Sequence, residues 1–67
     1  MNNRGIVHVV CIKERIFKQG EMFWKYTPVF ESSVKTVSMM VAKGAKKYHR
    51  HVVVESKGDG FYAETSV

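Results

Sequence analysis

The segment IVHVVCIKERIF, residues 6–17, constrains the fold of this chain more than any other part of the sequence. Its β-branched residues favour a strand, in which successive side chains alternate between two faces. Ile6, His8, Val10 and Ile12 share one face, and Val7, Val9 and Cys11 share the other. Because both faces are largely apolar, both must be covered, and the sequence predicts a strand at the centre of a sheet.

Three further strands are expected where β-rich segments are separated by turn signals. The tetrapeptide KQGE, which contains Gly20, predicts a hairpin turn into a second strand over residues 22–30, MFWKYTPVF. Pro28 has no N–H for a ladder, so this strand should lie at an edge or end near there. A third strand is expected over residues 49–56, HRHVVVES. KGDG then turns the chain into FYAETSV, which forms either a fourth strand or a half-ordered tail.

Between the second and third strands, the stretch SVKTVSMMVAKGAKKYHRH has the period of an amphipathic helix that Ser32 or Ser33 could cap. The predicted apolar face consists of Val34, Val37, Val41, Ala45 and Tyr48. The predicted solvent face consists of Lys35, Lys43, Lys46 and Lys47. Gly44 either weakens the helix from within or ends it as a C-terminal cap.

These elements predict one α+β domain over residues 1–67. Its expected core is a four-stranded antiparallel sheet, β-β-α-β-β in sequence and 2-1-3-4 in space, with one helix packed on one face. A chain of 67 residues has no room for a second domain, and such a core yields only about 3–5 kcal/mol of stability. Cys11 is the only cysteine, so no internal disulfide can add to it, and tight packing or a dimer must suffice.

The second half of the helical stretch carries the strongest charge cluster. Lys43, Lys46, Lys47, His49 and Arg50 are predicted binding residues, because a chain with a net charge of +5 suits an acidic partner. Two interpretations stay open at this point. The cluster binds nucleic acid or an acidic protein, or it is the solvated side of an ordinary helix end.

Aromatic residues predict a second binding element. One helix covers only one face of a four-stranded sheet, so several rings should remain on the uncovered face, and Trp24 and Tyr26 share a face of the second strand. The alternative is that the rings pack at the rim of the core. An exposed face would suit a host protein or a ribonucleoprotein, a homodimer through the open sheet face, or strand addition at an edge.

Catalysis and cofactors are not expected. Cys11 and His8 would lie on opposite faces of one strand, and no phosphate-binding loop, nucleophile elbow or paired-carboxylate spacing is present. His49 and His51 would point the same way on a strand, but no cysteine or carboxylate completes a metal site with them. The lone cysteine, and the lack of a signal peptide or an apolar stretch of spanning length, lead us to expect a cytoplasmic protein without membrane contact.

The segments SSVKTVSMMVAKGAKK, HVVVES and GDGFYAE occur in this order over residues 32–63, about half the chain. In pattern and order they resemble a class of small phage-encoded inhibitors of host defence, which includes anti-CRISPR proteins that block type I surveillance complexes. A phage antitoxin against a ribonuclease toxin and a small archaeal ribosomal protein have a similar hairpin-then-helix layout. The anti-CRISPR resemblance implies a stoichiometric binder, without catalysis, that keeps nucleic acid from a large complex.

We therefore expect a small basic protein of phage or mobile-element origin that inhibits or modulates a host macromolecular complex by protein–protein binding. The alternative is a nucleic-acid-binding protein that uses the same basic cluster.

Overall fold

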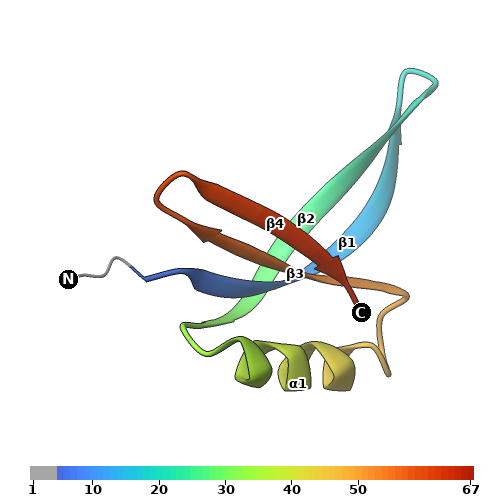
Figure 1. The fold of residues 1–67 in the computed structure, drawn as a ribbon. Coiled ribbons are helices and arrows are strands. Elements are labelled where there is room, and N and C mark those ends of the chain that lie inside the picture. Colours follow the sequence, from blue (N-terminus) through green and yellow to red (C-terminus); the bar gives the residue numbers. More distant parts are fainter. Residues whose placement is uncertain (1–4) are drawn as a thin grey trace.

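The computed structural model describes residues 5–67, which form a sheet with one helix beneath it (Figure 1). In chain order the elements are β1 (Val7–Lys18), β2 (Glu21–Ser32), α1 (Lys35–Ala45), β3 (His51–Gly58) and β4 (Phe61–Ser66). The strands lie in the order β2-β1-β3-β4, and every neighbouring pair is antiparallel. The predicted fold class and strand order are confirmed.

The β1–β2 hairpin turns where the sequence predicts. Gln19 and Gly20 have φ values of 49° and 80°, and glycine adopts this left-handed region at little cost. β2 is an edge strand, as Pro28 requires. The β1–β2 register shifts between Val10 and Cys11, where β2 carries one extra residue, Val29. Such a bulge bends the strand and increases its twist.

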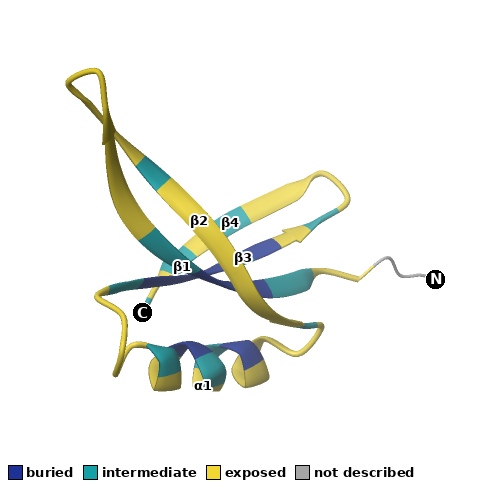
Figure 2. Ribbon diagram, turned by 180° about the vertical axis from the view of Figure 1, so that it is seen from behind, coloured by how far each residue is buried: buried dark blue, intermediate teal, exposed yellow. Residues whose placement is uncertain are grey.

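The main core lies between α1 and the sheet, as the buried stretches of α1, β1 and β3 show (Figure 2). Its fully buried members are small or β-branched residues, namely Val10, Ala42, Val52 and Val54. Ile12, Met39, Val41, Ala45 and Val67 pack around them. Val10 and Ile12 therefore lie on the helix side of β1, on the face to which the sequence pattern assigned them.

The buried face of α1 differs from the predicted one. Val34, Val37 and Tyr48 are all exposed, whereas Ser38 and Ala42 are fully buried. Ser38 and Ala42 are small, which allows a helix backbone to approach a sheet closely. Tyr48 is exposed because the helix ends at Ala45, three residues before it. Gly44 thus lies within the helix and does not cap it, and no serine side chain caps the first turn.

Polar groups beneath α1 are satisfied by one another. The hydroxyl of Ser38 donates to the backbone oxygen of His8 at 2.7 Å. His8 Nδ1 lies 2.6 Å from the hydroxyl oxygen of Ser56, a buried residue that is its direct neighbour on β3. A buried hydroxyl without a partner would destabilise the fold, so these contacts explain why serines are tolerated in the core.

The face of the sheet opposite α1, here called the open face, has a smaller core of its own. Val9, Cys11 and Val53 are buried there, and Val7 packs against them. No helix among residues 5–67 covers this face. Long side chains from the strands cover it instead.

The outer half of the β1–β2 hairpin extends beyond the rest of the sheet (Figure 1). The pairing of β1 with β3 ends at Lys13 and His51, so residues 14–25 form a two-stranded ribbon, here called the arm. Cross-strand pairs within the arm join Ile16 to Phe23 and Phe17 to Met22. All four side chains are substantially exposed.

Replacing Val54 by alanine should lower the free energy of unfolding by about 2 kcal/mol, because this side chain is fully buried between β3 and α1. The matched control is Val29→Ala on the edge strand. Val29 is half exposed, so its loss should change the stability by less than about 0.5 kcal/mol. Urea titrations with equal m-values would measure both, and equal midpoints for the two variants would contradict the assigned core.

Candidate functional site: the open face and the basic loop

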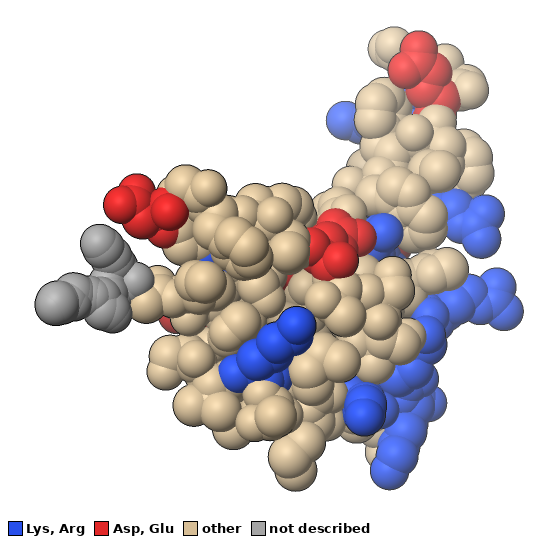
Figure 3. All heavy atoms as spheres, viewed as in Figure 1, with Lys and Arg blue, Asp and Glu red and all other residues tan. Residues whose placement is uncertain are grey.

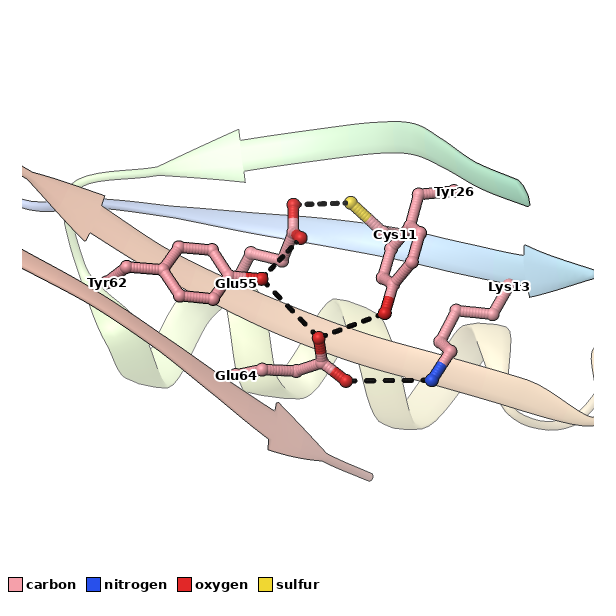
Figure 4. Close-up of polar contacts among 6 residues, drawn as sticks. All are labelled: Cys11, Lys13, Tyr26, Glu55, Tyr62 and Glu64. Carbon is pink, nitrogen blue, oxygen red and sulfur yellow. Dashed lines mark hydrogen bonds and ion pairs between the residues drawn. The ribbon is translucent and has the colours of Figure 1, made fainter. Parts of the chain in front are cut away.

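A network of polar side chains covers the open face (Figure 4). The Cys11 thiol donates to Glu55 Oε1 at 3.4 Å, and the Tyr62 hydroxyl donates to Glu55 Oε2 at 2.7 Å. Glu64 accepts from the Tyr26 hydroxyl at 3.1 Å and pairs with Lys13 Nζ at 3.6 Å. The contacts join β1, β2, β3 and β4, so the network ties all four strands together across the small core.

Glu55 and Glu64 face each other directly across β3 and β4. Two like charges in that position would repel each other and destabilise the strand pair. The donors of the network offset this repulsion, and Lys57 adds a cation 3.9 Å from Glu55. Both carboxylates thus have a structural explanation, and we assign neither a catalytic role.

The thiol of Cys11 is held in its neutral form. Burial and the hydrogen bond to Glu55 raise its pKa from 9.0 to about 11. The hydrogen bond to Glu55 likewise raises the pKa of the Tyr62 hydroxyl. A nucleophilic cysteine needs a lowered pKa and access to solvent, and Cys11 has neither.

Cations and aromatic rings meet at the end of the network near the arm. Lys13 Nζ lies 4.6 Å from the ring centroid of Trp24 and 5.3 Å from that of Tyr26. The guanidinium of Arg15 lies 5.8 Å from the Trp24 ring. Trp24 packs against His51 in a T-shaped arrangement, with ring centroids 5.0 Å apart. Trp24 is half-buried, so the predicted binding residue also has a structural role here.

His51 connects this corner of the open face to the helix end. Partial burial is the main reason why the pKa of its imidazole is lowered below 6.5, and the charges of Arg15, Arg50, Lys13 and Lys46 lower it further. Cations from β1 and from the segment after α1 are therefore close to one side chain. Its Nε2 atom is buried and has no hydrogen-bond partner among residues 5–67. A neutral imidazole tolerates that position better than a charged one.

Residues 46–50 connect α1 to β3 and are here called the basic loop; β3 begins at His51, two residues later than predicted. The loop contains four predicted binding residues, Lys46, Lys47, His49 and Arg50, and all are exposed. Lys43 is exposed on the last turn of α1. Lys46 Nζ donates to the backbone oxygen of Val67 at 2.6 Å. Lysine and arginine atoms gather where α1 ends and the chain enters β3 (Figure 3).

The predicted site residues are therefore not all in one place. The structure brings Lys46, Lys47, His49 and Arg50 together in the loop, whereas Tyr26 belongs to the open-face network. The sequence interpretation missed Tyr48, the most exposed large hydrophobic residue at 83%, by assigning it to the core. Its four loop neighbours, all basic or histidine, were the signal that it faces solvent.

The three histidines do not converge on one point. His8 contacts Ser56 beneath α1, His51 contacts Trp24 on the open face, and His49 lies in the basic loop before β3 begins. The idea that His49 and His51 share a strand face is thus wrong. No group of three histidine, cysteine or carboxylate side chains within residues 5–67 is placed to hold a metal ion.

No protein-family model matches the chain, and neither the curated proteins nor the solved structures include a significant match to it. Within the described part of the chain, no helix has the length and hydrophobicity needed to cross a membrane.

The Cys11 thiol should react slowly with iodoacetamide in the folded protein. In urea the rate should level off above a pH of about 9, whereas the native rate should still rise towards pH 11, because the native pKa is raised. Mass spectrometry after timed quenching would measure both profiles. Native labelling at pH 8 that is as fast as labelling in urea would contradict the buried thiol.

Acid should destabilise the protein through His51. Its folded pKa lies below 6.5, so the unfolded chain takes up this proton first as the pH falls. The contribution of His51 to stability is complete above a pH of about 6.5 and is lost as the pH falls through the lowered folded pKa. An NMR titration of the His51 ring protons would measure this pKa, and a midpoint at or above 6.5 would contradict the environment described.

Proposed function

We propose that this protein is a non-enzymatic binding protein that inhibits or modulates a host macromolecular complex by stoichiometric protein–protein binding. The exposed apolar surface of the arm is the observation that carries this proposal. No other strand of residues 5–67 lies beside the arm, and it presents four apolar side chains to solvent, namely Ile16, Phe17, Met22 and Phe23. Two-stranded ribbons are marginally stable alone in water, and exposed apolar groups of this kind are typical of a surface that a partner covers.

The arm is a better candidate for protein docking than the open face. The centre of the open face is occupied by the network of Glu55, Glu64, Lys13 and the two tyrosines, whose polar groups already have partners. The arm presents aromatic and methionine side chains, which are enriched at the centres of protein interfaces. The arm and the residue before it also carry four cations, Lys13, Arg15, Lys18 and Lys25. The carboxylates of the same segment are those of Glu14 and Glu21, so its net charge is positive. A partner with an apolar hollow and an acidic rim would complement it.

The resemblance of residues 32–63 to small phage-encoded inhibitors favours a nucleic-acid-handling complex of the host, such as a CRISPR surveillance complex, as the partner. A lone, buried, unreactive cysteine suits a reducing compartment, and we propose the cytoplasm as the place of action.

Phe17→Asp should abolish capture of the partner, because it places a charge in the apolar surface of the arm. Met40→Asp is the control, since Met40 lies on α1 and is 72% exposed, against 71% for Phe17. Affinity capture from nuclease-treated host lysate would compare wild type with both variants. We expect a protein that is bound by wild type and Met40→Asp and is absent from Phe17→Asp.

Circular dichroism should show that both variants remain folded, because neither residue belongs to a core cluster. If Phe17→Asp and Met40→Asp capture the same proteins in equal amounts, the arm is not the docking surface.

A further inference from the structure

The distribution of charge along the chain sets the basic loop apart from the arm. Residues 32–54 contain five lysines and arginines and no aspartate or glutamate. The remaining residues contain six basic and six acidic side chains, so they balance. The net charge of +5 therefore equals the charge of the five cations on α1 and the basic loop.

Among the described residues, four of the five cations of this segment form no side-chain hydrogen bond or ion pair, and the fifth, Lys46, donates to the backbone oxygen of Val67. The two ion pairs of residues 5–67 involve Lys13 and Lys57, both outside the segment. The carbonyl groups at the end of α1 do not need the lysines either. Ala42, Gly44 and Ala45 accept backbone hydrogen bonds from residues 46–49. Charges left unpaired in this way are available to a polyanion.

The exposure of Tyr48 is a second, independent observation that points to a ligand at the basic loop. Its side chain is 83% exposed, and it lies in the middle of the sequence Lys46-Lys47-Tyr48-His49-Arg50. Tyr48 belongs to neither core cluster and makes no side-chain hydrogen bond within the described residues. An exposed ring between cations can stack on a nucleobase while its neighbours contact the adjacent phosphates.

From these observations we propose that the basic loop binds single-stranded nucleic acid. Tyr48 stacks on one base, and Lys47, Arg50 and Lys43 contact the phosphodiester backbone. The ligand is a single strand because the bases of a duplex stack on each other and offer no free face to the ring. This site is separate from the protein-docking arm and adds a second activity to the protein.

The surface beside the loop extends the same chemistry towards β1. His51 follows the loop directly, and the cations of Lys13 and Arg15 lie over the Trp24 ring with which His51 packs. A strand that leaves the loop on this side would meet the guanidinium of Arg15 at the base of the arm, whereas the charge of Lys13 is paired with Glu64. The carboxylates at the tip of the arm and at the β3–β4 turn lie away from this cluster (Figure 3), whereas Glu64 lies beside Lys13.

Fluorescence anisotropy with labelled 12-nucleotide oligo-dT and oligo-U tests the proposal. Tyr48→Ala should weaken binding about tenfold, because one base–ring stack is lost, and Tyr48→Phe should retain it. The control is Phe17→Ala, which removes a ring of similar exposure from the arm and should leave the affinity unchanged. Tyr48 is too exposed for its loss to unfold the protein, and circular dichroism would verify this.

Salt dependence tests the phosphate contacts. Three contacts predict a slope of about −2 for log affinity against log salt, and Lys47→Glu should make that slope shallower by about 0.7. Lys18→Glu changes the net charge equally at the tip of the arm and should have little effect. The two oligonucleotides also distinguish DNA from RNA as the preferred ligand, and binding to either one supports the site.

Three results would overturn the proposal: no binding to either oligonucleotide, equal affinity for Tyr48→Ala and wild type, or binding to duplex DNA as tight as to a single strand. The outcome of this test is also independent of the outcome of the test of the arm. Phe17→Asp should lose the protein partner and keep oligonucleotide binding, whereas Tyr48→Ala should show the opposite pattern.

Discussion

β1 must be buried on both faces, and the rest of the fold follows from this requirement. α1 covers the face that carries Val10, and residues 5–67 contain no second helix for the face that carries Val9 and Cys11. The strands cover that second face with their own long side chains. Lys13 and the tyrosine and glutamate side chains lie over the small valines, and their polar ends bond to one another. A polar network thus takes the place of a second layer over the open face.

The sequence was sufficient for the architecture because its strongest signals are local. The two-sided apolar pattern placed β1 in the centre, Gly20 placed the first turn, and Pro28 placed β2 at an edge. Which face of α1 is buried could not be predicted in the same way. The predicted apolar face did not include Ser38, because a hydroxyl is not expected in a core, but the oxygen of His8 accepts its hydrogen bond there.

Two features of the candidate surfaces also lay beyond the sequence. The sequence of residues 14–25 predicts a pair of strands, but it does not show whether a third strand lies beside them. The exposure of Phe17 and Met22 could therefore be established only from the register of β1 with β3. The position of Tyr48 depended on where α1 ends. Continuing the helical period beyond Ala45 assigned the ring to the core, and the turn after Ala45 directs it to solvent.

The placement of all the net charge in residues 32–54 gives the molecule an electrostatic polarity as well as a positive sign. The part of the fold that holds α1 and the basic loop is strongly positive, and the remainder is neutral as a whole. In the field of a polyanion such a body experiences a torque in addition to an attraction, so it turns its charged end forward while still diffusing. The orientation of first encounter is thus set at a distance, before any side chain makes contact.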